Sequence, residues 1–323
     1  MNSSTIAEAL ASNAPKRIVV GSDSHAEMAA AVLRDRPDLE VRHAKLGDLT
    51  ADDFAWGEAY LGFRRPALAS MGNIRWVHST GAGIDPWLYP QELPREILLT
   101  RSSESFGPMI AEWALARALA FTQQLLELHA LQQQRSWAKR DIPMLAGTNA
   151  LIVGTGDVGV HVARAFGAMG CDVRGVSRSG TGDTAAFSTV WRASELREVV
   201  RDARWIIVVL PLTNETRGLI SREVLSHCTG AVLMNAGRGP VVEEHAIPEA
   251  LEQGWLSGAA LDVFEQEPLP AASPLWTDSR VMISPHIAGL TTVEGAVAGF
   301  VECLRDLEQG KTPKWKVDRE RQY

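Results

Sequence analysis

One stretch of this chain, an apolar run that breaks into three glycines, constrains the fold more than any other. Residues 150–160 read Ala-Leu-Ile-Val-Gly-Thr-Gly-Asp-Val-Gly-Val, so a short buried strand leads into the spacing Gly-x-Gly-x-x-Gly. In such a strand-turn-helix unit, Gly154 permits the tight turn, Gly156 lets the backbone approach a pyrophosphate, and Gly159 lets the helix pack on the strand. The positive end of that helix would hold the pyrophosphate. The sequence therefore predicts a dinucleotide site at this turn.

The length, the net charge and the apolar runs of the chain limit which class of protein it can belong to. The 323 residues are about twice the usual length of one domain, which predicts two domains. A formal net charge of -7 provides no basic footprint for nucleic acid or an anionic membrane, so we expect small-molecule partners. No secretory leader pattern is visible in the first 16 residues and no apolar run is long enough to span a membrane, which favours a cytoplasmic protein.

The cysteines fit neither a disulfide framework nor a zinc motif. They are odd in number and widely spaced, at Cys171, Cys228 and Cys303. We therefore expect buried apolar fillers in a reducing compartment, and no metal site.

Extended and helical runs alternate along the chain, which is typical of parallel sheets covered by helices on both faces. The first hundred residues are expected to form a small α/β domain, with extended runs at 17–20, 39–41, 59–63, 74–78 and 97–100. From the glycine motif onward we expect the six strands of a doubly wound Rossmann fold, at 151–153, 173–176, 205–210, 231–235, 257–261 and 281–284.

Helical patterns lie before and after these strands. Residues 109–126 are predicted to form a long helix buried between domains or subunits, followed by a polar helical arm over 127–140, and Trp113 and Trp137 in this region are expected to be core residues. A final amphipathic helix, with a predicted capping box at Thr291 and Glu294, has no place in the Rossmann sheet and is expected to return to the first domain.

The fold prediction follows from this order of elements. We expect an α/β protein with two doubly wound parallel-sheet domains, in which a dinucleotide-binding Rossmann domain (104–291) is inserted in a flavodoxin-like substrate domain (1–103 and 292–323).

The residues after the second Rossmann strand bear on the choice of cofactor. NAD enzymes of this fold carry an acidic residue there for the ribose hydroxyls, whereas residues 176–180 read Val-Ser-Arg-Ser-Gly. Arg178 offers a planar donor fork for a phosphate, with hydroxyl donors from Ser177 and Ser179 beside it. The missing acid also removes repulsion of a 2'-phosphate. We predict that NADP(H) is preferred and that NAD(H) is a second possible cofactor; the competing interpretation is that Arg178 is a solvated loop charge.

Three polar side chains follow the last Rossmann strands, at the edge where open parallel sheets bind ligands. Arg238 lies in Asn-Ala-Gly-Arg-Gly-Pro, Glu267 in Asp-Val-Phe-Glu-Gln-Glu-Pro and His286 in Ser-Pro-His-Ile-Ala-Gly. A lone histidine is usually structural, but three groups of complementary chemistry at successive strand ends indicate a site. An earlier loop at 79–85, Ser-Thr-Gly-Ala-Gly-Ile-Asp, is either a carboxylate-binding loop or a simple turn.

The motifs at 79–85, 210–218 and 284–286 together resemble the D-isomer-specific 2-hydroxyacid dehydrogenase family, most of all its NADPH-preferring members of the glyoxylate/hydroxypyruvate reductase type. The resemblance implies an NAD(P)-dependent oxidoreductase that reduces a 2-keto acid to a D-2-hydroxy acid, as a homodimer with its active site between two α/β domains. It assigns the family's catalytic arginine, glutamate and histidine roles to Arg238, Glu267 and His286.

The same resemblance gives the expected ligand contacts. The substrate is expected to contact Gly81, Ala82, Gly83, Arg238 and His286. The cofactor is expected to contact Gly154, Gly156, Asp157, Val158, Gly159, Ser177, Arg178, Ser179, Leu210, Pro211, Thr216, Ala236, Gly237, Arg238, Asp262, His286, Ala288 and Gly289, with Asp262 on the nicotinamide side.

These roles agree with the chemistry of the side chains. Arg238 can bind the carboxylate of a 2-keto acid and polarise its carbonyl, while His286 as imidazolium donates the proton. Glu267 would orient the imidazole and favour its charged form. The loop amides at 81–83 would bind the substrate carboxylate from the other domain on closure. Residues 63–65, Phe-Arg-Arg, either border this pocket or form a plain surface loop.

Three alternatives share the fold. Formate dehydrogenases lack the glutamate partner of the histidine, so Glu267 argues against them. Phosphoglycerate dehydrogenases often carry an added regulatory domain, for which this chain has no room, although short forms of them exist. The alternative from another class is a nucleotide-sensing interaction protein of the C-terminal binding corepressor type, which keeps the polar triad. The missing acid after the second strand and the lack of extended tails weigh against it.

Overall fold

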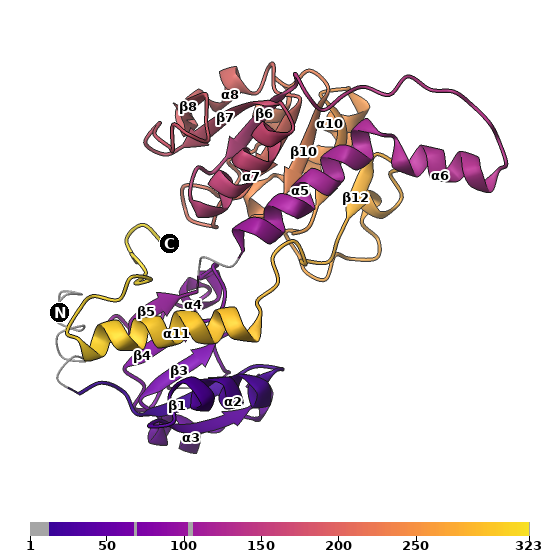
Figure 1. Cartoon of the computed structure of the whole chain (residues 1–323). Helices are drawn as coiled ribbons and strands as arrows, with labels where there is room; N and C mark the ends of the chain where they lie inside the picture. Colours follow the sequence, from indigo (N-terminus) through magenta and orange to yellow (C-terminus); the bar gives the residue numbers. More distant parts are fainter. Residues whose placement is uncertain (1–12, 68–69, 103–105, 323) are drawn as a thin grey trace. The chain divides into compact units, whose positions relative to one another are not determined.

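A computed structural model describes residues 13–67, 70–102 and 106–322 (Figure 1). The chain divides into two compact units, which we call unit 1 (Met1–Ser105 and Thr291–Tyr323) and unit 2 (Phe106–Leu290). The predicted domain boundary at residues 103 and 104, and most of the first 16 residues, lie outside the described part of the chain.

Unit 1 is built on a five-stranded parallel sheet in the order β2-β1-β3-β4-β5, the flavodoxin-like order expected from the sequence. Its strands are β1 (Arg17–Gly21), β2 (Glu40–Ala44), β3 (Ala59–Gly62), β4 (Trp76–Ser79) and β5 (Leu98–Arg101). Its helices are α2 (His25–Asp35), α3 (Ala51–Trp56), α4 (Asp85–Leu88) and α11 (Val293–Glu308), with a 3-10 turn η1 (Leu46–Asp48).

Both faces of this sheet are buried under helices. Because successive side chains of each strand point to opposite faces, the residues of one strand contribute to two separate apolar cores. Ile18 and Val20 of β1 belong to one apolar core, together with residues of α2 and α11. Val19, between them, belongs to the other core, with Phe54 of α3. The predicted alternation of strands and covering helices is therefore confirmed in this unit.

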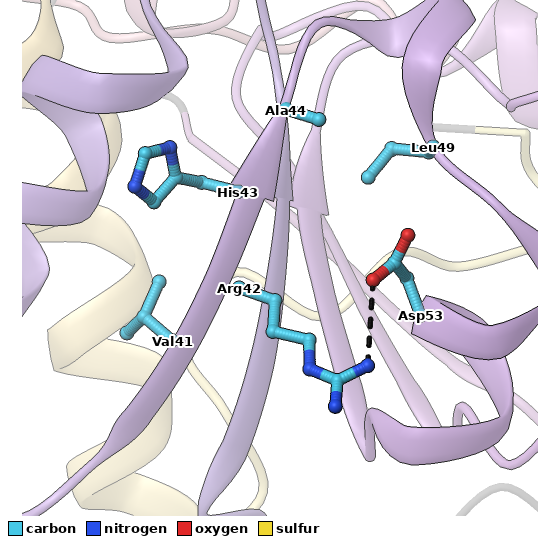
Figure 2. Close-up of a pocket in the computed structure, with 6 residues that line it drawn as sticks. All are labelled: Val41, Arg42, His43, Ala44, Leu49 and Asp53. Atoms are coloured by element: carbon cyan, nitrogen blue, oxygen red, sulfur yellow. Dashed lines mark ion pairs between the residues drawn. The ribbon is translucent and has the colours of Figure 1, made fainter.

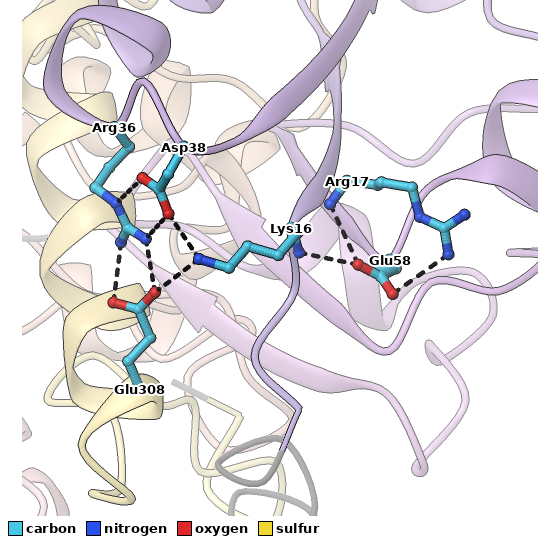
Figure 3. A network of polar contacts seen from close by, with 6 residues as sticks. All are labelled: Lys16, Arg17, Arg36, Asp38, Glu58 and Glu308. Atoms are coloured by element: carbon cyan, nitrogen blue, oxygen red, sulfur yellow. Dashed lines mark hydrogen bonds and ion pairs between the residues drawn. The ribbon is translucent and has the colours of Figure 1, made fainter.

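The C-terminal helix α11 packs on unit 1, as expected. The ring of Phe300 stacks on Trp76 of β4, with centroids 4.7 Å apart and planes within 7°. Figure 3 shows the polar contacts at the end of this helix: the guanidinium of Arg36 donates to both carboxylate oxygens of Glu308, at 3.0 and 2.6 Å, and to those of Asp38, at 2.8 Å each. Hydrogen bonds from Arg36 and Lys16 hold the pKa of Asp38 well below its usual range.

The start of α11 differs from the prediction by one residue. Thr292, not Thr291, is the N-cap, and its side chain accepts a hydrogen bond of 3.0 Å from the backbone N–H of Gly295. Glycine at this position cannot return the reciprocal bond of a capping box, so the predicted box with Glu294 was wrong.

Unit 2 is built on a seven-stranded parallel sheet in the order β12-β11-β10-β9-β6-β7-β8. The strands are β6 (Asn149–Val153), β7 (Asp172–Ser177), β8 (Thr189–Arg192), β9 (Trp205–Val208), β10 (Ala231–Asn235), β11 (Leu256–Leu261) and β12 (Val281–Ile283). The six predicted strands are present, but the count of six was wrong because it missed β8, a short edge strand with no fully buried residue.

The helices of unit 2 are α5 (Gly107–Thr122), α6 (Leu125–Gln133), α7 (Asp157–Ala168), α8 (Leu196–Val199), α9 (Arg222–Leu225) and α10 (Ile247–Glu252). Short 3-10 turns are η2 (Ala193–Glu195), η3 (Gly239–Val241), η4 (Glu244–Ala246) and η5 (Pro274–Trp276). Among the described helices, none is long and apolar enough to cross a membrane. In the same part of the chain no group of three or more His, Cys, Asp or Glu side chains could hold a metal ion.

The segment before the glycine motif differs from the predicted helix and arm. Gln124, in the left-handed region with φ 49°, interrupts the helix between α5 and α6, and the helical arm ends at Gln133 instead of continuing to residue 140. Trp113 is buried as predicted, but Trp137 is 96% exposed, so that prediction was wrong. Figure 1 shows the reason: α6 and the chain after it extend away from the sheet of unit 2.

The three cysteines are free. Cys228 and Cys303 are buried as predicted, whereas Cys171 is only partly buried.

Candidate active site

The glycine turn has the geometry that a pyrophosphate requires. Gly154 has φ 115°, a conformation that favours glycine. Gly156 is the N-cap of α7 and makes no side-chain hydrogen bond there, so the first backbone N–H groups of the helix receive no bond from a capping side chain. A Cβ on Gly159 would lie 1.9 Å from the carbonyl oxygen of Gly154, which excludes any larger residue there. A Cβ on Gly156 would meet nothing within 4 Å, so the backbone at this position faces open space. The turn therefore fits the predicted nucleotide.

The loop after β7 carries the residues predicted to select the cofactor. Ser177 Oγ donates to the carbonyl of Thr181 at 2.9 Å, and Ser179 Oγ lies 2.6 Å from Thr181 Oγ1, so both hydroxyls help to fix the loop. Arg178 is half exposed, and its Nη1 lies 3.9 Å from Oε2 of Glu215 in the loop after β9. The sequence interpretation missed Glu215, because no pattern links positions on two separate strand ends.

Two other segments predicted to contact the cofactor lie against each other. Thr216 Oγ1 donates to the carbonyl of Pro211 at 2.7 Å and closes the loop after β9. The N–H of Gly237 donates to Asn235 Oδ1 at 3.1 Å, and a Cβ on Gly237 would lie 2.6 Å from the carbonyl oxygen of Leu210. Residues 210–216 and 235–237 therefore form one surface at the carboxyl ends of β9 and β10.

Glu267 and His286 form a hydrogen-bonded pair, with Oε2 of Glu267 2.8 Å from Nδ1 of His286. Oε1 of Glu267 accepts a bond of 3.1 Å from the backbone N–H of Phe264. Partial burial works to raise the pKa of Glu267, but the bonds from His286 and Phe264 and the charges of His286 and Arg238 lower it overall. The carboxylate is therefore ionised at neutral pH and holds the imidazole through Nδ1.

Both members of the pair stay open to solvent, since their side chains are 41% exposed in His286 and 38% exposed in Glu267. Arg238 is partly buried, and its Nη1 donates to the carbonyl of Gly237 at 2.8 Å. The positive charge of Arg238 contributes to the lowered pKa of Glu267. Unit 2 thus brings the three predicted polar groups to the same edge of its sheet.

Asp262, at the end of β11, is buried under the loop that carries His286. Its Oδ1 accepts bonds from the Ser284 hydroxyl at 2.5 Å and the N–H of Ile287 at 3.0 Å, and its Oδ2 accepts from the N–H of Ala288 at 2.8 Å. In this structure the carboxylate therefore fixes the loop at residues 284–288.

The predicted substrate loop lies in unit 1, after β4. The ring of Phe63 packs on Gly81, where a Cβ would lie 2.6 Å from Cε2 of the ring. Arg101 Nη1 donates to the carbonyl of Ala82 at 2.7 Å. The sequence interpretation missed Arg101, although Ser79 and Arg101 are partners in the sheet register. Phe63 thus borders this loop, whereas Arg65 turns to the carbonyl of Gln91 at 3.2 Å.

Unit 1 also contains a pocket of about 320 Å³ beside β2. Figure 2 shows Arg42 and Asp53 pointing toward each other there, joined by an ion pair of 3.5 Å, while His43 points to the other side of the strand. The pocket is lined by Val41, Arg42, His43, Ala44, Leu49 and Asp53. None of the residues predicted to bind cofactor or substrate lines it.

Comparison with known proteins identifies the family. Residues 115–288, more than half of the chain, match the protein-family model described as "D-isomer specific 2-hydroxyacid dehydrogenase, NAD binding domain". The chain belongs to the D-isomer-specific 2-hydroxyacid dehydrogenase family. This 2-hydroxyacid dehydrogenase family member is thus an NAD(P)-dependent oxidoreductase, and the resemblance seen in the sequence is confirmed.

Relatives in the family match nearly the whole chain. A glyoxylate/hydroxypyruvate reductase A of Serratia proteamaculans (strain 568) is 34% identical over 302 residues, which cover 90% of this chain and 94% of the relative. A D-isomer specific 2-hydroxyacid dehydrogenase of Xanthobacter autotrophicus Py2, solved in complex with NADPH and MES, is 32% identical with a TM-score of 0.87, covering 96% of this chain and 100% of that one.

An NADPH-dependent glyoxylate/hydroxypyruvate reductase of Sinorhizobium meliloti, solved with NADP and sulfate, is 28% identical with a TM-score of 0.86. It covers 95% of this chain and 100% of its own. The predicted fold of two parallel-sheet α/β domains is therefore confirmed by both the strand order and the solved relatives.

Proposed function

We propose that this family member is an NADPH-preferring reductase that converts a 2-keto acid to a D-2-hydroxy acid. The observation that carries the proposal is the hydrogen bond between His286 and Glu267 at the ligand-binding edge of a Rossmann sheet. The names of the relatives make glyoxylate and hydroxypyruvate the first substrates to test.

His286 is assigned the role of proton donor. Glu267 holds Nδ1, so Nε2 is the atom that faces substrate and transfers the proton to the developing alkoxide. The ionised carboxylate of Glu267 accepts the bond at Nδ1 and so fixes the orientation of the ring for the transfer. The bound nicotinamide cofactor supplies the hydride.

Arg238 is assigned to the substrate. Its planar guanidinium binds a carboxylate through two parallel hydrogen bonds and stabilises negative charge on the neighbouring carbonyl oxygen. In unit 1, the backbone N–H groups of Gly81, Ala82 and Gly83 are proposed to bind a substrate carboxylate. Arg101 supports that role, because its bond to the carbonyl of Ala82 fixes the loop and brings a positive charge to it.

The preference for NADPH is assigned to the loop after β7. Arg178 supplies the charge for a 2'-phosphate, and Ser177 and Ser179 hold the loop that presents it. The turn at Gly154, Gly156 and Gly159, followed by Asp157 and Val158, is proposed to hold the pyrophosphate. The remaining contacts are proposed at Leu210, Pro211, Thr216, Ala236, Gly237, Asp262, Ala288 and Gly289.

We also propose that the protein forms a homodimer through the region of α6. Large apolar side chains are exposed along this helix and the segment after it, at Leu125, Leu126, Leu128, Trp137, Ile142 and Met144. Such a concentration of exposed apolar surface is typical of an interface. Light scattering coupled to gel filtration measures the mass directly, and Leu125→Asp with Leu126→Asp is expected to give monomer.

The reductase is tested by following oxidation of NADPH and NADH with a panel of glyoxylate, hydroxypyruvate and larger 2-keto acids. We expect turnover with at least one of these acids and a higher kcat/KM with NADPH than with NADH. Absence of turnover with every acid, together with tight binding of NADPH, would contradict the proposal and favour a nucleotide-sensing protein.

A further inference from the structure

His286 lies in a loop whose backbone is held in an unfavourable conformation. Its φ is 55°, in the left-handed region of the backbone that residues other than glycine rarely adopt. The N–H of His286 donates to the carbonyl of Asp262 at 2.8 Å, and the side chain of Asp262 binds the next two N–H groups. Contacts around the loop, rather than local preference, therefore set the direction of the imidazole.

A buried chain of hydrogen bonds connects this loop to helix α5. The indole Nε1 of Trp113 donates to Ser284 Oγ at 2.9 Å, and the Ser284 hydroxyl donates to Asp262 Oδ1 at 2.5 Å. All three residues are at most 6% exposed. An indole N–H can only donate, so it leaves the Ser284 hydrogen for the carboxylate and gives the chain a single direction.

Arg117, one turn further along α5, reinforces this arrangement. Its guanidinium lies 4.8 Å from the centre of the Trp113 ring, which restricts the orientation of the indole. Burial lowers the pKa of Arg117, while the charge of Asp262 acts in the opposite direction. The indole is thus fixed between a cation and the hydroxyl of Ser284.

We propose that Trp113 is a positioning residue for His286, acting through Ser284 and Asp262. The inference rests on the proposed function, because it assigns to α5 the role of holding the proton donor at its working angle toward Glu267. Removing the indole N–H frees the Ser284 hydroxyl to rotate, which weakens the support that Asp262 gives to the loop. The packing of the ring alone does not supply this hydrogen bond.

The test compares Trp113→Phe and Ser284→Ala with the matched control Trp205→Phe. Trp205 is also a buried tryptophan of unit 2, and its Nε1 donates to Thr148 Oγ1 at 2.9 Å, away from the predicted site. We expect roughly tenfold lower kcat in Trp113→Phe and in Ser284→Ala, with KM for NADPH nearly unchanged. The double variant should lose no more than the single ones, and Ser284→Thr should recover most of the rate.

The NMR signal of the His286 Nδ1 proton gives a readout that does not need turnover, because it reports the hydrogen bond to Glu267. In Trp113→Phe this signal should move upfield and broaden, because a looser loop lengthens that bond. In Trp205→Phe it should stay as in the wild type. Equal behaviour of Trp113→Phe and Trp205→Phe, in both rate and NMR signal, would overturn the proposal. If the wild-type protein reduces no 2-keto acid, the proposed function fails, and the NMR signal still decides whether Trp113 positions the ring.

Discussion

Each unit of this protein carries a histidine near the carboxyl end of a parallel strand, but the two side chains differ in burial and in hydrogen-bond partners. His78 of β4 is fully buried between hydroxyls, with Nδ1 2.7 Å from Thr100 Oγ1 and Nε2 3.1 Å from Ser102 Oγ. His286 of unit 2 is exposed and bonded to a carboxylate. Burial among neutral hydroxyls keeps the His78 ring uncharged, whereas the His286 ring reaches solvent and a carboxylate, as the proposed proton transfer requires.

The first way to break this comparison is to remove the His286 ring and measure turnover. His286→Ala should lower kcat for reduction by about 10²–10⁴-fold, the usual contribution of a general acid. Binding of NADPH, measured by fluorescence or calorimetry, should stay nearly intact. The control is His227→Ala, which removes a partly exposed imidazole of the same unit that bonds to the carbonyl of Glu223. Unchanged turnover in His286→Ala would show that the pair has no part in proton transfer.

The second test uses stability against pH. Burial lowers the pKa of His78 from 6.5 to about 3, so in this interval the unfolded state binds more protons than the folded one. The free energy of unfolding should therefore fall as the pH falls, by about 1.4 kcal/mol per unit from this group, with the full contribution present above the unfolded pKa. Denaturant unfolding of wild type and His78→Gln at several pH values measures the slope.

His78→Gln should be less stable at neutral pH but lose less of that stability on acidification. Exposed His129, changed to Gln, should keep the wild-type slope. A slope that is identical in wild type and His78→Gln would mean that other groups cause the acid sensitivity.

Local patterns made much of the molecule predictable. The glycine turn, the alternation of strands and the candidate residues Arg238, Glu267 and His286 each depend on short runs of sequence read against a known type of fold. The sequence did not predict strand β8 or the exposure of Trp137, because an edge strand and an extended arm lack the apolar periodicity of buried elements.

Tertiary contacts account for the other omissions. The bond from Trp113 to Ser284 joins residues 171 positions apart, and no sequence pattern records such a pair. The same holds for Glu215 beside Arg178, which lie on loops after two different strands. Residue types near strand ends could be predicted, but which of them touch is decided by packing in three dimensions.

The third prediction concerns the carboxylate that distinguishes His286 from His78. Hydrogen bonds and nearby positive charges lower the pKa of Glu267, so its charge is present throughout the neutral range. Glu267→Gln keeps the shape but removes the negative charge beside the imidazole, so kcat should fall by roughly tenfold to hundredfold. Steady-state kinetics at neutral pH, with NADPH and 2-keto acid both saturating, measures the change. Glu265→Gln, two residues earlier and exposed, is the control. Equal kcat in wild type and Glu267→Gln would contradict this role.

A fourth prediction concerns the cofactor loop. Arg178→Asp with Ser177→Ala should raise KM for NADPH by about tenfold or more, since a charge-assisted contact to phosphate is replaced by repulsion. KM for NADH should change much less, because NADH has no 2'-phosphate. Steady-state kinetics with each cofactor, at saturating 2-keto acid, measures both. Equal increases for the two cofactors would leave Arg178 as an ordinary surface charge.

The smallest expected effect concerns the exposed neighbour of Arg178. Glu215 lies 3.9 Å from the guanidinium, so its charge both competes for Arg178 and repels a 2'-phosphate bound there. Because exposed ion pairs contribute only about 0.2–1 kcal/mol, Glu215→Gln should lower KM for NADPH by a factor of about 1.4 to 5 and leave KM for NADH unchanged. The matched control is Glu223→Gln, which breaks an exposed pair with Arg197 in the same unit. The gain should shrink as salt concentration rises, since exposed charges are screened; a gain of the same size for NADH would show that Glu215 acts on the loop rather than on the phosphate.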